Sequence, residues 1–466
     1  MRAILFLSWI LVAFSASAEQ YDLVIANGHV MDPESGLDAV RFIGLIGHKI
    51  RTISTSPLSG KDVIDARGLV VAPGFIDIHC HGQDDENYRY KARDGVTTAL
   101  EMEVGASPVD EWYRAREGKA LVNFGASSGH IPARMHVLHD SGTFLPRDNA
   151  VNNAATPAEV EQILRSVQEG LNEGGLGIGM GIAYMPKTSR EEILDLFKLA
   201  HARAAAIYVH MRNPGPVEPG VVDSLQEVIG DAVMTGASLH IVHLPSMAFR
   251  QTPLALKMID GARQNGLDVT TECYPYTAGM TNIESAIFDP GWQQRLGISY
   301  GDLQWTATGE RLTSDTFNKY RQQGGPVIIH SIPENIVALT LAHPGVIIAS
   351  DGWLIHGKGH PRAAGTYARV LARYVREQHA LTLMEALRKM TELPAERLGL
   401  SNIGRLQEGA DADLTIFDPA RVQDKATYAN PAQYSEGIPF VVVNGVPVVR
   451  NGKIQDGVYP GIGLKR

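Results

Sequence analysis

The 466-residue sequence predicts an α/β fold: a (β/α)8, TIM-like barrel with a small β-sandwich formed from both chain ends. Three observations support this prediction. The chain is too long for one ordinary domain, both ends are rich in strand-like runs, and the middle alternates apolar runs with helix-like segments. We assign a signal peptide to 1–18, the composite β-sandwich to 19–73 and 408–466, and the barrel to 74–407.

The first 18 residues, MRAILFLSWILVAFSASA, have the pattern of a secretory signal peptide. Arg2 precedes an apolar segment that is short for a membrane span, and Ala16-Ser17-Ala18 fits a small-residue cleavage site. The alternative is an uncleaved N-terminal anchor. No other stretch is apolar enough to cross a bilayer, so we expect an exported protein, periplasmic or secreted, with no stable membrane span after signal removal.

The composition indicates a globular protein and argues against some partners. The net charge is -9, so a broad nucleic-acid surface, which needs clustered Lys and Arg, is not expected. Two cysteines, Cys80 and Cys273, do not make a disulfide scaffold. One disulfide is compatible with the sequence, but both residues lie in strand-like runs, which favours free buried thiols.

Strand-like runs at the two chain ends predict the β-sandwich. Near the N-terminus, YDLVIANGHVMDPESG indicates a strand, an Asn-Gly turn and a second strand, and VRFIGLIGHKIRTIS and VIDARGLVVAPG continue the pattern. Near the C-terminus, DADLTIFDP is followed by FVVVNGVPVVRNGK, which has another Asn-Gly turn.

The middle of the chain predicts the alternating strands and helices of a barrel. The strand-like runs are GFIDIHC, TTALEMEV, ARMHVLHD, GLGIGMGI, AIYVHM, LHIVHL, LDVTTECYPY, PVIIHS and GVIIASDG. Helix-like segments such as SREEILDLFKLAHARAA, with a capping pattern at Ser189, and TPLALKMIDGARQNG lie between them. About eight such units close a barrel, whose chemistry lies at the C-terminal strand ends.

Polar side chains follow several of these strands. His79 and His81 are two residues apart after an apolar run, so they point the same way on a strand, as a transition metal would require. Taken alone, a His-x-His pair is as compatible with a chance occurrence as with a metal site. His210, His243 and Asp351 end three other strands, and all five side chains would meet at one barrel mouth.

This convergence predicts hydrolysis of an amide or a similar C–N bond. A bound metal ion lowers the pKa of water and polarises a carbonyl, so a metal-bound hydroxide is the expected nucleophile. Asp351 is the natural group to accept the water's proton and pass it to the leaving nitrogen. His240, three residues before His243, would face the other side of a regular strand and is interpreted as structural. His330, in VIIHSIPE, is equally compatible with substrate contact and with packing.

The sequence resembles the amidohydrolase superfamily in APGFIDIHCH, SDG and GRLQEGADADLTIFDP. It is more closely similar to the D-aminoacylase (N-acyl-D-amino-acid deacylase) family in GLGIGMGIAYMP, YVHMRN, ECYPYTAGMT, HPRAAGTYARVLARYVRE and KMTELPAERLGL, which occur in the family's order from about Tyr21 to Lys453. The resemblance implies a zinc-dependent enzyme with one or two Zn²⁺ ions, or another divalent metal. Its implied small-molecule substrates are N-acyl amino acids of D configuration.

The resemblance also implies roles at matching positions. The metal ligands would be His79, His81, His210 and His243, the catalytic residue Asp351, and the residues near the substrate Tyr184 and Arg362. The planar guanidinium of Arg362 suits a substrate carboxylate, and its alternative role is a structural ion pair. Tyr184, Tyr274 or His330 would assist at the developing oxyanion.

One departure from the family concerns the residues after GVTT, where the family commonly has a zinc-binding cysteine. Here GVTTALEMEVGAS carries Glu101 and Glu103, which face the same way on a strand. A carboxylate can replace a thiolate as a zinc ligand. Glu103 is favoured because it lies nearer the strand's C-terminal end, and Glu101 comes second. The alternative is that both are interior carboxylates paired with Arg or Lys.

Two other functions remain open on the sequence. The same metal core would serve a cyclic-amide hydrolase or an isopeptide-type dipeptide hydrolase, because a fold does not fix a function. A non-catalytic exported binding protein is the third hypothesis, and the presence of Asp351 argues against it. The sequence leaves open the acyl group, the amino acid, its stereochemistry, the number of metal ions and the oligomeric state.

Overall fold

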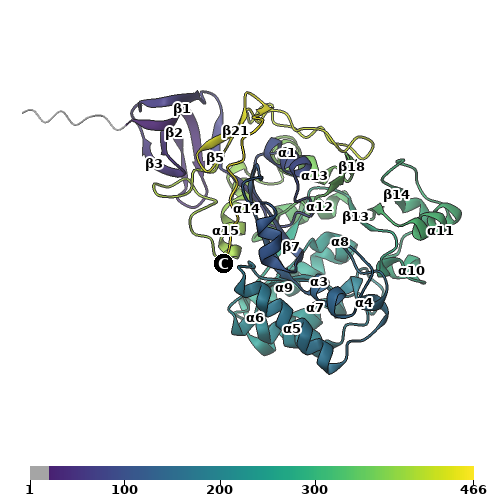
Figure 1. Cartoon of the computed structure of the whole chain (residues 1–466). Helices are drawn as coiled ribbons and strands as arrows, with labels where there is room; N and C mark the ends of the chain where they lie inside the picture. Colours follow the sequence, from purple (N-terminus) through teal and green to yellow (C-terminus); the bar gives the residue numbers. More distant parts are fainter. Residues whose placement is uncertain (1–19) are drawn as a thin grey trace, which may run out of the picture.

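The computed structural model describes residues 20–466, and the predicted signal peptide lies outside the described residues (Figure 1). Its centre is an eight-stranded parallel sheet that is nearly closed, so the predicted barrel is confirmed. In spatial order the strands are β16 (Val346–Ile348), β12 (Val269–Cys273), β11 (Ser238–Ile241), β10 (Ala206–His210), β9 (Ile178–Gly181), β8 (Asn123–Gly129), β7 (Val96–Ala106) and β6 (Phe75–Asp77).

The barrel closes between β16 and β6 through a few specific contacts in place of a full ladder. Cys80 forms an isolated parallel bridge with Gly352. The Asp351 N–H donates to the His79 carbonyl at 2.7 Å, and the Ser350 N–H donates to the Asp77 carboxylate at 2.9 Å. The segments that carry His79 and Asp351 are therefore held side by side.

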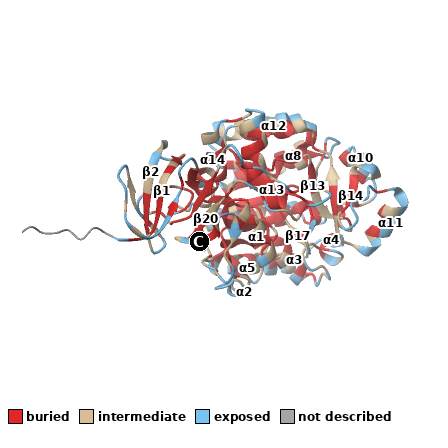
Figure 2. Ribbon diagram, turned by 90° about the horizontal axis from the view of Figure 1, so that it is seen from above, coloured by how far each residue is buried: buried red, intermediate tan, exposed pale blue. Residues whose placement is uncertain are grey.

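Helices connect the barrel strands, and one of them begins at the capping residue that the sequence predicts. The main ones are α1 (Asp85–Arg93), α5 (Pro157–Asn172), α6 (Arg190–Ala202), α7 (Val221–Thr235), α9 (Thr252–Gln264), α12 (Glu334–Ala342), α13 (Arg362–Arg369) and α14 (Leu383–Met390). At the start of α6 the Ser189 side chain accepts a hydrogen bond from the Glu192 N–H, as its capping pattern predicts. Buried residues run continuously through the barrel and its helices (Figure 2).

Two of the predicted barrel strands are wrong. The run ARMHVLHD lies mostly in helix α3 (His130–Val137), and the barrel strand at this place is β8, with the sequence NFGASSG. The run PVIIHS forms β15 (Pro326–His330) of a separate antiparallel sheet, in the order β13 (Ala278–Asn282), β15 and β14 (Leu303–Trp305). This sheet is an insertion between β12 and β16.

Strands from both chain ends form a second large sheet, as predicted. Its order is β22 (Lys453–Ile454), β21 (Val446–Arg450), β20 (Phe440–Val443), β19 (Leu414–Phe417), β5 (Val70–Pro73), β1 (Tyr21–Asp32), β2 (Leu37–Ile46) and β3 (Lys49–Ser54), and β4 (Gly60–Asp65) also pairs with β1. It lies at the opposite end of the molecule from the inserted β14 (Figures 1 and 2). The C-terminal segment does not stay in this sheet, because Gly461 and Leu464 hydrogen-bond to the barrel segment 120–124.

The Asn-Gly pairs of this sheet have two different structures. Asn444-Gly445 forms the predicted hairpin turn between β20 and β21, with positive φ at both residues. The predicted N-terminal turn is wrong: Asn27, at φ 59°, creates a bulge inside the single strand β1. The bulge lets β1 change partners, from β4 before it to β5 after it.

In the described part of the chain, no helix is long and apolar enough to cross a membrane. Cys80 and Cys273 are free and buried, as the sequence favours.

Candidate metal centre

The C-terminal mouth of the barrel gathers the predicted histidines and Asp351. His79 and His81 follow β6, His210 ends β10, His243 follows β11, and Asp351 follows β16. All five side chains are buried or nearly so. His243 and Asp351 adopt left-handed backbone conformations, with φ of 32° and 51°. Such conformations are rare for residues with a side chain and are concentrated at functional sites.

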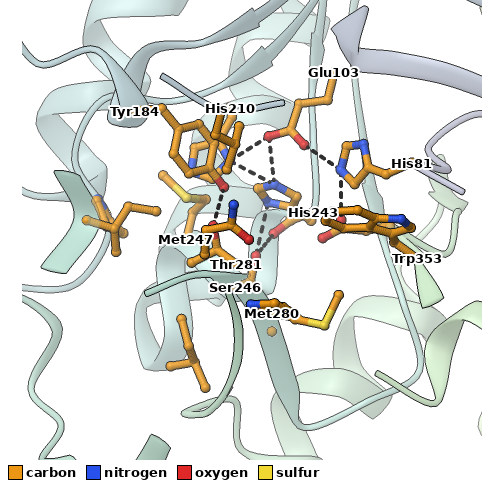
Figure 3. Close-up of a pocket in the computed structure, with 18 of the residues that line it drawn as sticks. His81, Glu103, Tyr184, His210, His243, Ser246, Met247, Met280, Thr281 and Trp353 are labelled. Atoms are coloured by element: carbon orange, nitrogen blue, oxygen red, sulfur yellow. Dashed lines mark hydrogen bonds and ion pairs between the residues drawn. The ribbon is translucent and has the colours of Figure 1, made fainter. Parts of the chain in front are cut away.

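Glu103, near the end of β7, lies among the four histidines, of which Figure 3 labels His81, His210 and His243. Its Oε2 is 2.9 Å from His79 Nε2 and 3.1 Å from His81 Nε2. Its Oε1 is 2.6 Å from His210 Nδ1 and 3.5 Å from His243 Nε2. One carboxylate therefore contacts both pairs of imidazoles, each pair through a different oxygen.

Two groups of metal-ligating atoms share Glu103. The first consists of His79, His81, Glu103 and Asp351, and the second of Glu103, His210 and His243. Within each group the ligand atoms lie within 4.8 Å of one another. The arrangement offers two neighbouring cation sites joined by one carboxylate.

The chemistry of these atoms fits a divalent ion such as zinc. His79 Nε2 faces His81 Nε2 at 3.3 Å, and His243 Nε2 faces His210 Nδ1 at 3.1 Å. Two facing imidazole nitrogens can share only one proton, whereas both can donate their lone pairs to a metal ion. His210 Nε2, the other nitrogen of that ring, is buried without a hydrogen-bond partner.

The opposite ring nitrogens are held by other side chains. His79 Nδ1 lies 2.5 Å from Glu272 Oε1, His81 Nδ1 lies 2.8 Å from Glu101 Oε2, and the Ser246 hydroxyl lies 3.0 Å from His243 Nδ1. Such contacts fix the orientation and tautomer of a metal-binding histidine. The structure thus places Glu101 behind His81 and outside both ligand groups, and it assigns the central position to Glu103.

Sequence reasoning missed Glu272 entirely. This β12 residue also accepts from His240 Nε2 at 3.0 Å, so it joins His79 to the buried His240. His240 is therefore part of the support beneath the metal centre, in line with its structural interpretation. Strand alternation is the signal that could have indicated Glu272, because it places Thr270 and Glu272 on one face of β12. In the structure Thr270 on that face also contacts His240.

Electrostatics of the cluster favour a bound cation. Burial alone would raise the pKa of Glu103, but hydrogen bonds with His210, His243 and His79 hold it well below its ordinary value. Burial alone would lower the pKa of His79, but the carboxylates of Glu272 and Asp351 outweigh that effect and raise it well above the ordinary value. In the metal-free chain the cluster therefore retains protons that an incoming metal ion displaces.

Asp351 connects the metal-ligating groups to Arg362. Its Oδ1 lies 3.3 Å from His81 Nε2, and its Oδ2 lies 2.9 Å from Arg362 Nη1. Arg362, the first residue of α13, is only 1% exposed and stacks over the Tyr274 ring at 4.6 Å. The structural ion pair considered for Arg362 is present, and its guanidinium also lines the cavity beside the metal centre.

The cavity beside the cluster is walled in part by the inserted sheet. Strand β13 contributes Met280, Thr281 and neighbouring residues, and the Thr281 hydroxyl donates to the Tyr184 hydroxyl at 3.1 Å. The Tyr274 hydroxyl is buried without a hydrogen-bond partner. His330 is not among the lining residues: its Nε2 pairs with Gln304 Oε1 at 2.9 Å.

A parallel α/β barrel with histidines and carboxylates converging at the C-terminal strand ends defines a metal-dependent hydrolase architecture. Residues 62–128 and 133–449 match the model of the amidohydrolase family. The chain belongs to this family, and the resemblance seen in its motifs is confirmed.

Known relatives align with nearly the whole chain. A D-aminoacylase of Alcaligenes xylosoxydans xylosoxydans is 31% identical over 479 residues, which cover 93% of this chain and 95% of the relative. An N-acyl-D-glutamate deacylase of the same organism is 30% identical over 475 residues, with 92% and 94% covered. The crystal structure of N-acyl-D-glutamate deacylase from Bordetella bronchiseptica, complexed with zinc and a phosphonate mimic of the tetrahedral intermediate, matches with a TM-score of 0.83 and 26% identity, covering 96% of this chain and 100% of that one.

Proposed function

We propose that the protein is a metal-dependent hydrolase that cleaves the amide bond of N-acyl amino acids of D configuration. The observation that carries the proposal is the position of Asp351, which contacts the histidine cluster through one oxygen and Arg362 through the other. A general base and a cation suited to an amino-acid carboxylate thus lie side by side at the metal centre. The names of the relatives supply the D configuration.

Each part of the site has a chemical task. The two groups around Glu103 would hold divalent ions, which would supply the Lewis acidity needed to activate water and polarise the acyl carbonyl. Asp351 accepts the proton of the attacking water and delivers it to the departing amine nitrogen. The Tyr274 hydroxyl, buried without a partner, and the Tyr184 hydroxyl can donate hydrogen bonds to the developing oxyanion.

Arg362 provides the contact that selects a substrate with a free carboxylate. Its guanidinium is fixed by the Tyr274 ring and by Asp351, so it needs little reorganisation to bind an anion. A substrate carboxylate at Arg362 places the neighbouring amide close to Asp351. A cyclic amide without a carboxylate would gain nothing from this contact, which favours the deacylase over the cyclic-amide hydrolase.

The test combines metal analysis with a substrate screen. Purified protein with its metal content measured is assayed on N-acetyl and N-formyl amino acids of both configurations, and on cyclic amides. We expect release of the free D-amino acid. In Asp351→Asn we expect metal to remain bound and turnover to fall about 10²- to 10⁴-fold. Arg362→Gln should reduce turnover of carboxylate substrates far more than turnover of cyclic amides, although it also removes the ion pair with Asp351.

Two outcomes would contradict the proposal. Metal-loaded protein that hydrolyses no amide would favour a binding protein, and cyclic amides hydrolysed equally well by the native protein and by Arg362→Gln would favour the cyclic-amide hydrolase.

We also propose that the protein is exported. The support is the leader-like pattern of residues 1–18, with its small residues at the expected cleavage site. N-terminal sequencing of the protein from fractionated cells tests this: we expect a mature chain starting at Glu19, outside the cytoplasm. An intact N-terminus in the cytoplasmic fraction would refute it.

A further inference from the structure

The cavity beside the metal centre has an unusual distribution of charge. Its charged or ionisable lining side chains are His81, Glu103, His210, His243, Asp351, Arg362, Tyr184 and Tyr274. Among the described lining residues, no lysine and no second arginine is present. Among the described side chains that line the cavity, Arg362 is therefore the one permanent cation.

The Arg362 guanidinium already has partners for its charge. Its Nη1 lies 2.9 Å from Asp351 Oδ2, and the proposed function assigns it to the substrate's α-carboxylate. A substrate with an acidic side chain brings a second carboxylate into a cavity whose described lining offers no lysine and no second arginine to pair with it. Burying a charge without a partner is strongly unfavourable, so such a substrate is penalised.

The remaining walls are mostly apolar on both sides of the metal centre, and their other polar side chains, Ser246, Thr281, Asn282 and Ser331, carry no charge. Near His81, the Phe144 ring lies 5.3 Å from the imidazole and 5.0 Å from the Trp353 ring. Figure 3 shows Trp353 beside His81, and Met247 on the other side, near Tyr184 and His210. Further apolar lining residues are Leu145, Phe249, Met280, Ile287, Leu296 and Ile329. The acyl group and the amino-acid side chain would therefore both meet walls that are mostly apolar and carry no further cation.

We propose that this enzyme selects N-acyl amino acids with uncharged, apolar side chains and rejects those with acidic side chains. The inference rests on the proposed function and adds the side-chain class that the cavity accepts. It separates this chain from a relative that it resembles almost equally in sequence, the N-acyl-D-glutamate deacylase. The selection of the substrate side chain would come from the cavity wall away from the metal centre, since both kinds of substrate would contact the metal centre and Arg362 in the same way.

The experiment compares kcat/KM of the metal-loaded protein for the N-acetyl derivatives of D-methionine, D-leucine, D-glutamate and D-aspartate. We expect the apolar substrates to be preferred by about 100-fold or more. Acidic substrates turned over within tenfold of the apolar ones would overturn this inference and leave the proposed function intact. Absence of turnover for all four would instead refute the proposed function.

Two lysine variants test whether the wall charge causes the selection. Met280 on β13 is half-buried and unbranched, so Met280→Lys adds a cation at similar length, and Met280→Gln is the matched uncharged control. Leu296→Lys places the cation on a second wall, at the end of α10 (Trp292–Leu296). At least one lysine variant should raise the glutamate-to-methionine ratio of kcat/KM more than tenfold, while Met280→Gln should not. Unchanged ratios in both folded lysine variants would overturn the assigned role of wall charge.

Discussion

Replacing Lys91 by methionine is expected to destabilise the barrel where it closes. Lys91 reaches from α1 into the barrel, and its Nζ lies 2.9 Å from Asp77 Oδ2 and 2.6 Å from the Ser350 hydroxyl. The two charged side chains are 2% and 0% exposed. Lys91→Met keeps most of the volume of the side chain and leaves the Asp77 carboxylate buried without a counter-charge.

The magnitude follows from the distance and the burial. At 2.9 Å and an effective dielectric constant of about 20, the attraction between the charges is about 6 kcal/mol, before the cost of removing both from water. Removing one partner of a buried pair costs about 3–5 kcal/mol of unfolding free energy, because the other charge stays buried. Lys91→Met should therefore lose about 3–5 kcal/mol. The double variant Lys91→Met/Asp77→Asn should recover most of it, since neither charge remains.

The assay is urea unfolding of the metal-free protein, followed by circular dichroism, for the native chain, both single variants and the double variant. Metal-free protein is needed because metal binding adds its own stabilisation to the folded state. A loss below about 1 kcal/mol in Lys91→Met, or a double variant no more stable than that single variant, would refute the reasoning. The recovery in the double variant distinguishes the ion pair from a general packing defect.

Further predictions concern the metal centre. Glu103→Gln should reduce the metal content below that of the native chain, measured by elemental analysis after dialysis; an unchanged metal content would contradict a shared carboxylate. Glu101→Gln should weaken metal binding by about 10- to 100-fold in a chelator competition, because His81 loses its orienting partner. Glu272→Gln should have a similar effect through His79, and unchanged affinity in both would contradict these orienting roles. Chelation should remove activity and leave the far-ultraviolet circular dichroism unchanged, because the barrel has its own hydrophobic core; loss of the spectrum would show that the metal holds the fold.

The sequence predicted most of the barrel because its strands are apolar runs, and it failed where a strand is not apolar. Strand β8, NFGASSG, is fully buried although it consists largely of small and polar residues. Its polar groups are satisfied internally, as when the Ser127 hydroxyl donates to the Met102 carbonyl at 2.9 Å. Hydrophobic periodicity does not detect such a strand. The run ARMHVLHD has alternating apolar residues, but most of it lies in helix α3, which begins at His130 directly after β8.

The site was predictable to the extent that its residues end apolar runs. This applies to His210, His243 and Asp351. The sequence could not show which of Glu101 and Glu103 joins the two ligand groups, beyond their order along β7, because strand alternation places both on one face. The register of β7 shifts between Glu101 and Ala106, and each carboxylate contacts a different nitrogen of His81. Only the three-dimensional structure shows which carboxylate reaches both ligand groups.

Glu103 takes the central position of the metal centre, and neither of the described ligand groups contains a thiolate. Its two oxygens face two different pairs of imidazoles, so oxygen and nitrogen atoms make up both ligand groups. Carboxylate and imidazole ligands bind zinc without offering a thiolate that oxidation can remove. The remaining thiols, Cys80 and Cys273, are buried, and burial raises the pKa of each to about 12, which keeps them protonated and unreactive. Because oxidation of thiols is favoured outside the cytoplasm, a metal centre without a thiolate suits the proposed export.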